Sequence, residues 1–101
     1  MIQITTAPQW LTNVIEHSKN SPVAVIFTSP TCVPCKELKP KIEALGRKVF
    51  EVDAGTSRDL AVGLGVRAAP TVRIYKDGEI IFQAVGDKPE ILDALVEHIA
   101  L

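Results

Sequence analysis

The 101-residue sequence predicts an α/β fold in which one mixed β-sheet is covered by helices on both faces. Short apolar, β-branched runs alternate along the chain with segments whose apolar residues recur every three or four positions. The last two runs are separated by Asp77-Gly78, a dipeptide typical of tight hairpins, so their strands are antiparallel, whereas strands joined through helices pair in parallel. The predicted order is β-α-β-α-β-α-β-β-α, in a single domain that spans residues 1–101.

The chain begins with a short strand in which Ile2 and Ile4 alternate with polar residues. Thr6 and Gln9 then form a capping box, which opens a predicted amphipathic helix over residues 7–19. Its apolar face is expected to consist of Leu11, Val14, Ile15 and Ser18, with Trp10 beside it.

The segment 23–27 is apolar without polar alternation, which is typical of a strand buried on both faces and places it in the centre of the sheet. A second helix is expected from about Cys32 to Gly46, because glycine suits a left-handed C-terminal cap. Pro40 interrupts this helix and should kink it. The inward face is expected to be Leu38, Ile42 and Leu45.

The second half contains, in order, a predicted strand over 49–53, a short helix over 59–64, a hairpin of strands 72–75 and 80–85, and a final helix. Thr56 or Ser57 is expected to cap the short helix, and Gly65 to end it. Asp87 and Glu90 are expected to cap the final helix. The apolar face of that helix is predicted to be Ile91, Leu92, Leu95, Val96 and Ile99.

Charge and composition exclude several classes of function. Lys and Arg number 11 against 12 Asp and Glu, and a formal net charge of −1 gives no electrostatic basis for binding nucleic acid. Residues 1–8 lack the basic and apolar regions of a signal peptide, and the longest apolar stretch, 22–27, is too short to span a bilayer. The expectation is a soluble, cytoplasmic monomer without a nucleic-acid or membrane partner.

The two cysteines are the most informative residues. Cys32 and Cys35 are the only ones, and they form a C-x-x-C pair where a helix should begin. Residues three apart share a helical face, with β-carbons about 5–6 Å apart, close enough for a disulfide. Free N–H groups and the positive end of the helix dipole favour a thiolate at the first position. We therefore expect Cys32 to be the nucleophile of thiol–disulfide exchange and Cys35 to be the resolving cysteine.

Three other interpretations of the cysteine pair stay open from the residues alone. A structural zinc site normally needs four ligands, and only His17 and His98, far along the chain, could join the cysteines. An inert structural disulfide would close a loop too short to stabilise the fold much. The two cysteines could also be unreactive core residues.

The residues around the pair resemble those of the thioredoxin family. Cys32-Val33-Pro34-Cys35-Lys36 is similar to the family's Cys-Gly-Pro-Cys-Lys motif, with Val33 where the family has glycine. The similarity covers nearly the whole chain in the family's order. Its further elements are Pro40, Val52-Asp53, Gly65-Val66-Arg67-Ala68-Ala69-Pro70-Thr71, Asp77-Gly78 and Gly86.

The resemblance implies a thioredoxin fold and a cis peptide bond between Ala69 and Pro70. In the family, the loop that carries this bond packs against the active-site pair, and its backbone pairs with the substrate like an added strand. We accordingly expect Ala69 and Pro70 to bind substrate. Val33, Pro34 and Lys36 are expected to support the cysteines.

The resemblance also implies the activity. It is that of an electron carrier that reduces protein disulfides, with the Cys32–Cys35 disulfide as its redox group and no bound metal or organic cofactor. A thioredoxin reductase-like protein would return the electrons. We expect the substrates to be proteins that contain disulfides.

Besides Val33, the chain departs from the family at four positions. Thr31 and Thr28 stand where tryptophans are usual, so the aromatic surface around the sulfurs is missing. By the same comparison, Ile26 stands where the family has a buried aspartate, and Val49 stands where it has the lysine associated with that aspartate. Replacing both partners of such a pair by apolar groups can leave the stability of the fold nearly unchanged. In the family, the buried aspartate helps to take the proton of the second cysteine, and Ile26 cannot do so. We expect water or the leaving thiolate to take the proton of Cys35, and the release of the target from the mixed disulfide to be slower than in a typical thioredoxin.

Two other functions are compatible with parts of the sequence. Glutaredoxins resemble the chain in a cis-proline and in a cysteine pair that encloses a proline, although their motif is C-P-x-C where this chain has Cys32-Val33-Pro34-Cys35. They commonly carry a Gly-Gly pair after the cis-proline for glutathione, where this chain has Thr71-Val72-Arg73. The second alternative, from a different class, is a binding module with a thioredoxin fold whose cysteine pair is incidental.

Overall fold

The computed structural model describes all residues, 1–101, and contains the predicted order of elements. Five strands form one sheet in the order β1-β3-β2-β4-β5, with β1 and β2 parallel to β3, and β4 antiparallel to β2 and β5. The mixed sheet predicted from the sequence is therefore confirmed. The strands are β1 (Ile2–Gln3), β2 (Val23–Thr28), β3 (Val49–Asp53), β4 (Thr71–Lys76) and β5 (Glu79–Val85).

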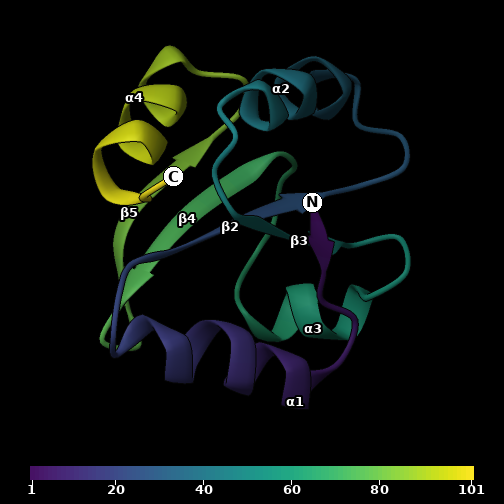
Figure 1. Ribbon diagram of the computed structural model, residues 1–101. Helices are drawn as coiled ribbons and strands as arrows, with labels where there is room; N and C mark the ends of the chain where they lie inside the picture. Colours follow the sequence, from purple (N-terminus) through teal and green to yellow (C-terminus); the bar gives the residue numbers. More distant parts are fainter.

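Helices cover both faces of the sheet (Figure 1). Helices α2 (Val33–Ala44) and α4 (Pro89–His98) lie on one face; α1 (Ala7–Trp10), its continuation η1 (Leu11–Glu16) and α3 (Arg58–Gly63) lie on the other. Two apolar clusters fill the space between these layers. One contains Ile26, Leu38 and Leu95, and the other contains Trp10, Phe27 and Val52.

Strand β2 is the centre of the sheet, as its uninterrupted apolar sequence predicts. All six of its residues are buried, and it pairs with β3 on one side and β4 on the other. Its register places Ile26 beside Glu51 of β3 and Val72 of β4. The chain leaves β2 after Thr28 and enters the turn that leads to the cysteines.

The first helix differs from the prediction in its inward face. After the predicted capping box at Thr6, the chain runs as an α-helix and then as a π-helix over Leu11–Glu16. The π-helix has a wider turn, with i→i+5 hydrogen bonds, so the buried residues are spaced by four: Trp10, Val14 and Ser18. Leu11, expected to face inward, is 55% exposed.

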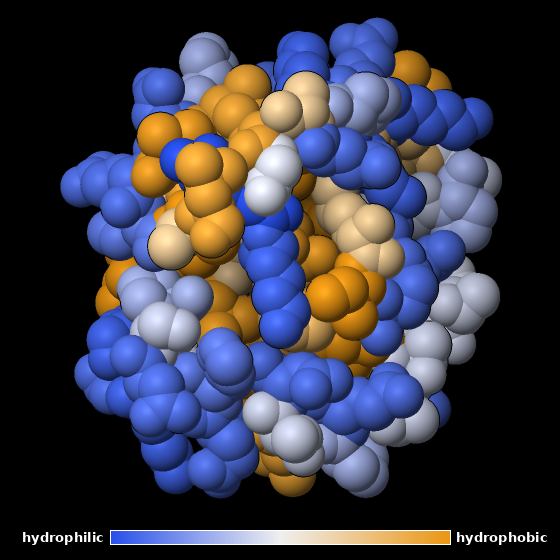
Figure 2. Space-filling model, viewed as in Figure 1, coloured by the Kyte–Doolittle hydropathy of each residue, from blue (hydrophilic) through white to orange (hydrophobic).

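The prediction for the start of α4 was wrong. The N-cap is Lys88, with no side-chain hydrogen bond to the helix, and Pro89 occupies the first turn, where its missing N–H costs nothing. Asp87 instead forms an ion pair with Lys41 of α2, at 3.3 Å. Later in α4, Val96 is 48% exposed although an inward position was expected, and Figure 2 shows apolar surface gathered over this helix.

The turn predictions are confirmed. Asp77 and Gly78 both have positive φ, 54° and 77°, as a tight hairpin requires. Gly46 and Gly65, with φ of 69° and 76°, follow the ends of α2 and α3. No helix in the structure combines the length and the apolar character needed to cross a membrane.

Candidate redox site

Cys32 and Cys35 lie where the chain passes from β2 into α2. Cys32 is the N-cap residue of α2, with extended backbone, and Cys35 is in the first turn. The two form a disulfide with Cα atoms 5.3 Å apart. The backbone N–H of Cys35 donates a hydrogen bond to Cys32 Sγ, at 3.1 Å, so one of the free donors of the helix start points at this sulfur.

The two cysteine residues differ in their exposure to solvent. Cys32 is 8% exposed and Cys35 is 2% exposed. Val33, between them, is 64% exposed, and Pro34 and Lys36 are exposed as well. Pro34 also removes one N–H from the first turn, because proline has no amide hydrogen. The surface around the pair therefore presents an aliphatic side chain and a cation but no aromatic ring.

The peptide bond between Ala69 and Pro70 is cis, as the resemblance predicts. It lies at the start of β4, next to the end of β2, since Thr71 pairs with Phe27. Two hydrogen bonds fix the segment: Gly86 N–H donates to Pro70 O at 2.8 Å, and Thr71 Oγ1 donates to Ala68 O at 2.6 Å. The N–H and C=O of Ala69 make no backbone hydrogen bond, so both are available to an added strand.

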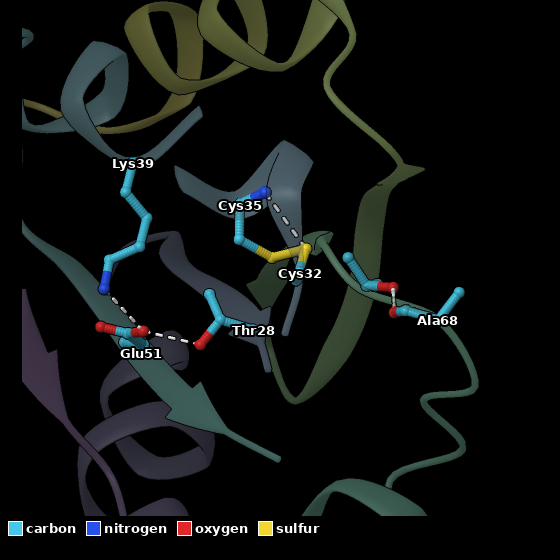
Figure 3. Close-up of a disulfide and its surroundings, with 7 residues drawn as sticks. Thr28, Cys32, Cys35, Lys39, Glu51 and Ala68 are labelled. Atoms are coloured by element: carbon cyan, nitrogen blue, oxygen red, sulfur yellow. Dashed lines mark hydrogen bonds and ion pairs between the residues drawn. A yellow bond between two sulfur atoms is a disulfide. The ribbon is translucent and has the colours of Figure 1, made fainter. Parts of the chain in front are cut away.

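A buried carboxylate that sequence reasoning missed lies beneath α2. Glu51 of β3 is only 3% exposed, and its carboxylate accepts hydrogen bonds from Thr28 Oγ1 (2.7 Å), Lys39 Nζ (3.0 Å) and Gln3 Nε2 (2.7 Å). In Figure 3, Lys39 reaches from α2 to Glu51, and the disulfide lies between this cluster and the Ala68 segment. Lys39 is one helical turn after Cys35, so the cluster ties the first turns of α2 to the sheet.

This cluster changes the interpretation of Ile26 and Val49. Both are buried apolar residues, but Val49 pairs with Ala24, and the residue beside Ile26 is Glu51. A buried charge is therefore retained close to the position where the family has its aspartate. The signal available in the sequence was a glutamate in the otherwise apolar strand 49–52, two residues after Val49 and hence on the same face.

The network keeps Glu51 ionised. Burial by itself raises the pKa of the Glu51 carboxyl, but the hydrogen bonds from Thr28, Lys39 and Gln3, together with the charge of Lys39, outweigh burial and lower this pKa below its usual value. A carboxylate with a lowered pKa and three bound donors is a weak proton acceptor. Glu51 is therefore suited to hold α2 in place and poorly suited to take a proton from Cys35.

The turn before Cys32 packs closely against the loop after β3, and this contact supplies a prediction. An added Cβ at Gly55 would overlap the ring of Pro30, whereas at Gly63 it would meet no atom within 4 Å. Gly55→Ala is expected to lower the free energy of unfolding by about 1–3 kcal/mol, because the backbone must move. Gly63→Ala is the matched control and is expected to raise it by about 0.5 kcal/mol, since alanine is the better helix former. Equal effects in urea denaturation would contradict the close contact.

The structure bears on the zinc interpretation. It contains no group of three or more His, Cys, Asp or Glu side chains placed to hold a metal ion. The two cysteines instead have each other as partners. A disulfide-forming pair at the start of a helix, with one sulfur held by a backbone N–H and a cis-proline segment at the neighbouring strand, defines a thiol–disulfide oxidoreductase.

Comparisons with known proteins identify the family within this class. The family model described as thioredoxin matches residues 2–100. A thioredoxin of Aspergillus fumigatus is 34% identical over 106 residues, which cover 97% of this chain and 94% of that protein. The crystal structure of Malassezia sympodialis thioredoxin has a TM-score of 0.80 at 30% identity and covers 97% of this chain and 90% of that one. The chain belongs to the thioredoxin family.

One further structural relative is a complex. It is described as a thioredoxin f2 bound to ferredoxin:thioredoxin reductase, and its match has a TM-score of 0.78 at 24% identity, over 95% of this chain and 91% of that one. At this identity the likeness concerns the fold.

Proposed function

We propose that this thiol–disulfide oxidoreductase reduces disulfides of other proteins, with Cys32 as the nucleophile and Cys35 as the resolving cysteine. The observation that carries the assignment is the hydrogen bond from Cys35 N–H to Cys32 Sγ at the N-cap of α2. A donor held at this position stabilises negative charge on Cys32 and none on Cys35. The greater burial of Cys35 supports the same order of events, because the first attack requires access to the target.

The reaction proceeds in two exchanges. The Cys32 thiolate attacks one sulfur of the target disulfide, a Cys32–target bond forms, and the other target sulfur leaves as a thiolate that takes up a proton. The Cys35 thiolate then attacks Cys32 Sγ, the mixed disulfide breaks, and the second target sulfur leaves. The protein is left with the Cys32–Cys35 disulfide, and two electrons have passed to the target.

The proton of Cys35 goes to water or to the departing target thiolate in this proposal. Ile26 offers no acceptor, and the carboxylate of Glu51 is occupied by three donors and has a lowered pKa. A leaving thiolate is by contrast adjacent to the reacting sulfurs and basic. Resolution is accordingly expected to be slower near neutral pH than in family members that carry the buried aspartate.

The remaining site residues shape and hold the substrate. We assign the pairing of the target backbone to the free N–H and C=O of Ala69, beside Pro70. Val33 presents an aliphatic side chain beside the cysteines, and Pro34 reduces the number of backbone N–H donors in the first turn of α2. Lys36 adds a positive charge next to the pair. These roles support the cysteines without taking part in the covalent steps.

The partners follow from the redox cycle. The oxidised pair must be reduced again, and we propose a thioredoxin reductase-like protein as the donor; the thioredoxin f2 described above is bound to such a reductase in its own structure. We further propose that the chain acts as a cytoplasmic monomer in cell redox homeostasis. Its substrates in this proposal are disulfide-containing proteins, and neither nucleic acid nor a membrane is a partner. The nearly neutral net charge of −1 supports the absence of nucleic acid.

The trapping experiment tests the assignment of the two cysteines. The Cys35→Ser variant, reduced and mixed with an oxidised model protein such as insulin, is expected to accumulate a covalent complex linked through Cys32, because serine cannot release the target. Mass spectrometry of the intact complex and of its peptides identifies the linkage. Cys32→Ser is the control and should form no comparable complex. Trapping through Cys35 in the control at the same rate would contradict the proposed order.

A further inference from the structure

Two of the four arginines have no partner within the protein. Arg47 and Arg73 donate hydrogen bonds to backbone or side-chain oxygens, such as Ile99 O and Leu64 O. Arg58 and Arg67 make no side-chain hydrogen bond or ion pair, and both are exposed. An arginine presents five N–H donors in a planar fork that fits a carboxylate. Two such groups are therefore free to bind an anion from outside.

Both free arginines line the same cleft. Its volume is about 330 Å³, and it lies between the turn before Cys32, the loop after β3, α3 and the segment that leads to Pro70. Phe27 and Ala61 belong to its apolar lining, and no Asp or Glu is among the residues that surround it. The cleft thus combines an apolar floor with two unpaired positive charges.

The cleft continues into the proposed substrate strand site. Ala68 and Ala69 are part of its wall, as are Ser29 and Pro30 on the other side, three and two residues before Cys32. Arg67 is two residues before Ala69, which corresponds to a distance of at most about 7 Å along an extended chain. A target segment paired with Ala69 would therefore place its next residues against Arg67, in the cleft that Arg58 also lines.

We infer that the cleft is a specificity site for acidic protein segments: Arg58 and Arg67 bind carboxylates of residues that flank the target disulfide. This inference rests on the proposed function, because the bound segment is the one whose disulfide Cys32 attacks. Charge complementarity selects the occupant, since the lining carries two cations and no anion. Binding strengthens the encounter with acidic targets and leaves the exchange chemistry unchanged.

The test compares two disulfide peptides that differ only in charge. Both contain one intramolecular disulfide; in one, two residues that flank a cysteine are Glu, and in the other they are Gln. The single-turnover rate constant for oxidation of the reduced protein is measured for each peptide at low ionic strength and again with 0.5 M NaCl. The wild type is expected to react about 5-fold faster with the Glu peptide, and this ratio should shrink in salt because screening weakens exposed charge pairs.

The variants connect this ratio to the cleft. In the Arg58→Gln, Arg67→Gln double variant, the two peptides are expected to react at equal rates, within about 2-fold. Lys19→Gln is the control, since Lys19 precedes β2 and lies at the end of that strand away from the cysteines; it removes one positive charge and should keep the wild-type ratio. Retention of the full ratio in the double variant, or its loss in Lys19→Gln, would overturn the inference.

The failure of the inference differs from the failure of the proposed function. If the wild type is oxidised by both peptides at the same rate, the acidic specificity is wrong and the oxidoreductase assignment stands. If neither peptide oxidises the wild type, the assignment itself fails and the inference falls with it. Urea denaturation of each variant tests whether that variant is folded. If the double variant is not folded, the single variants Arg58→Gln and Arg67→Gln replace it, and each is expected to lose part of the rate ratio.

Discussion

Replacing Lys39 with methionine is expected to lower the free energy of unfolding by about 2 kcal/mol at pH 7. Methionine retains much of the apolar stem of lysine, so the main loss is the charge that pairs with Glu51 at 3.0 Å. The variant leaves the Glu51 carboxylate without its cation, on a side chain that is only 5% exposed. Removal of one partner from a fully buried pair costs about 3–5 kcal/mol, and the value here is smaller because 34% of the Lys39 side chain is exposed.

Lys41→Met is the matched control. Lys41 lies on the same helix, two residues further, and forms one ion pair of similar length with Asp87, but its side chain is 52% exposed. Such a surface pair contributes at most about 0.5 kcal/mol. Urea denaturation of both variants measures the difference. Equal losses would contradict the view that the Glu51 cluster holds α2 to the sheet.

A second variant separates charge from packing. Glu51→Gln on the Lys39→Met background removes the unpaired charge, while the amide oxygen can still accept the hydrogen bond of Thr28. The double variant is expected to be more stable than Lys39→Met alone by about 1 kcal/mol at pH 7.

The Glu51 cluster also predicts a pH dependence. Because the folded-state pKa of Glu51 is lowered, its contribution is fully present above the ordinary pKa of glutamate and is lost as the pH falls through the lower, folded value. The stability gap between the wild type and Lys39→Met should therefore be widest near neutral pH and narrow in acid. A gap that is constant between pH 7 and pH 3 would contradict the ionised state assigned to Glu51.

The parts of the site that could be predicted from sequence are local. The Cys32–Cys35 spacing, the helix start and the glycine turns depend on neighbouring residues, and the structure contains them as expected. The cis bond before Pro70 was different, because it followed from resemblance to a family, and local chemistry alone would not have supplied it.

The parts that were missed depend on register and on helix geometry. Glu51 and Lys39 are 12 residues apart, and their contact requires both the β2–β3 register and the rotation of α2 over the sheet. Leu11 is exposed because the segment forms a π-helix, and no residue type in that segment predicts a π-helix. The cleft of Arg58 and Arg67 likewise forms from four separate segments that only the fold brings together.

The second expected result is that Cys32 loses its proton at a lower pH than a free cysteine does. Cys32 Sγ accepts the Cys35 N–H at 3.1 Å and caps a helix of 12 residues, so negative charge on it meets a backbone donor and the positive end of the dipole. The effect acts only on the first cysteine. Cys35, 2% exposed and one turn into the helix, has no such donor among the hydrogen bonds of the structure and should react slowly.

The alkylation rate of Cys32 as a function of pH tests the central claim most directly. The reduced Cys35→Ser variant, which keeps the backbone N–H at position 35, is treated with iodoacetamide between pH 5 and pH 10, and the modified fraction is measured by mass spectrometry. We expect the midpoint of the rate–pH curve to lie clearly below the value of about 8.5 for a free cysteine. At pH 7 the alkylation rate should be about 3-fold above that of a free thiol, since a more acidic thiol is also less nucleophilic. A midpoint at or above about 8.5, with no rate advantage at pH 7, would show that the helix start does not activate this sulfur.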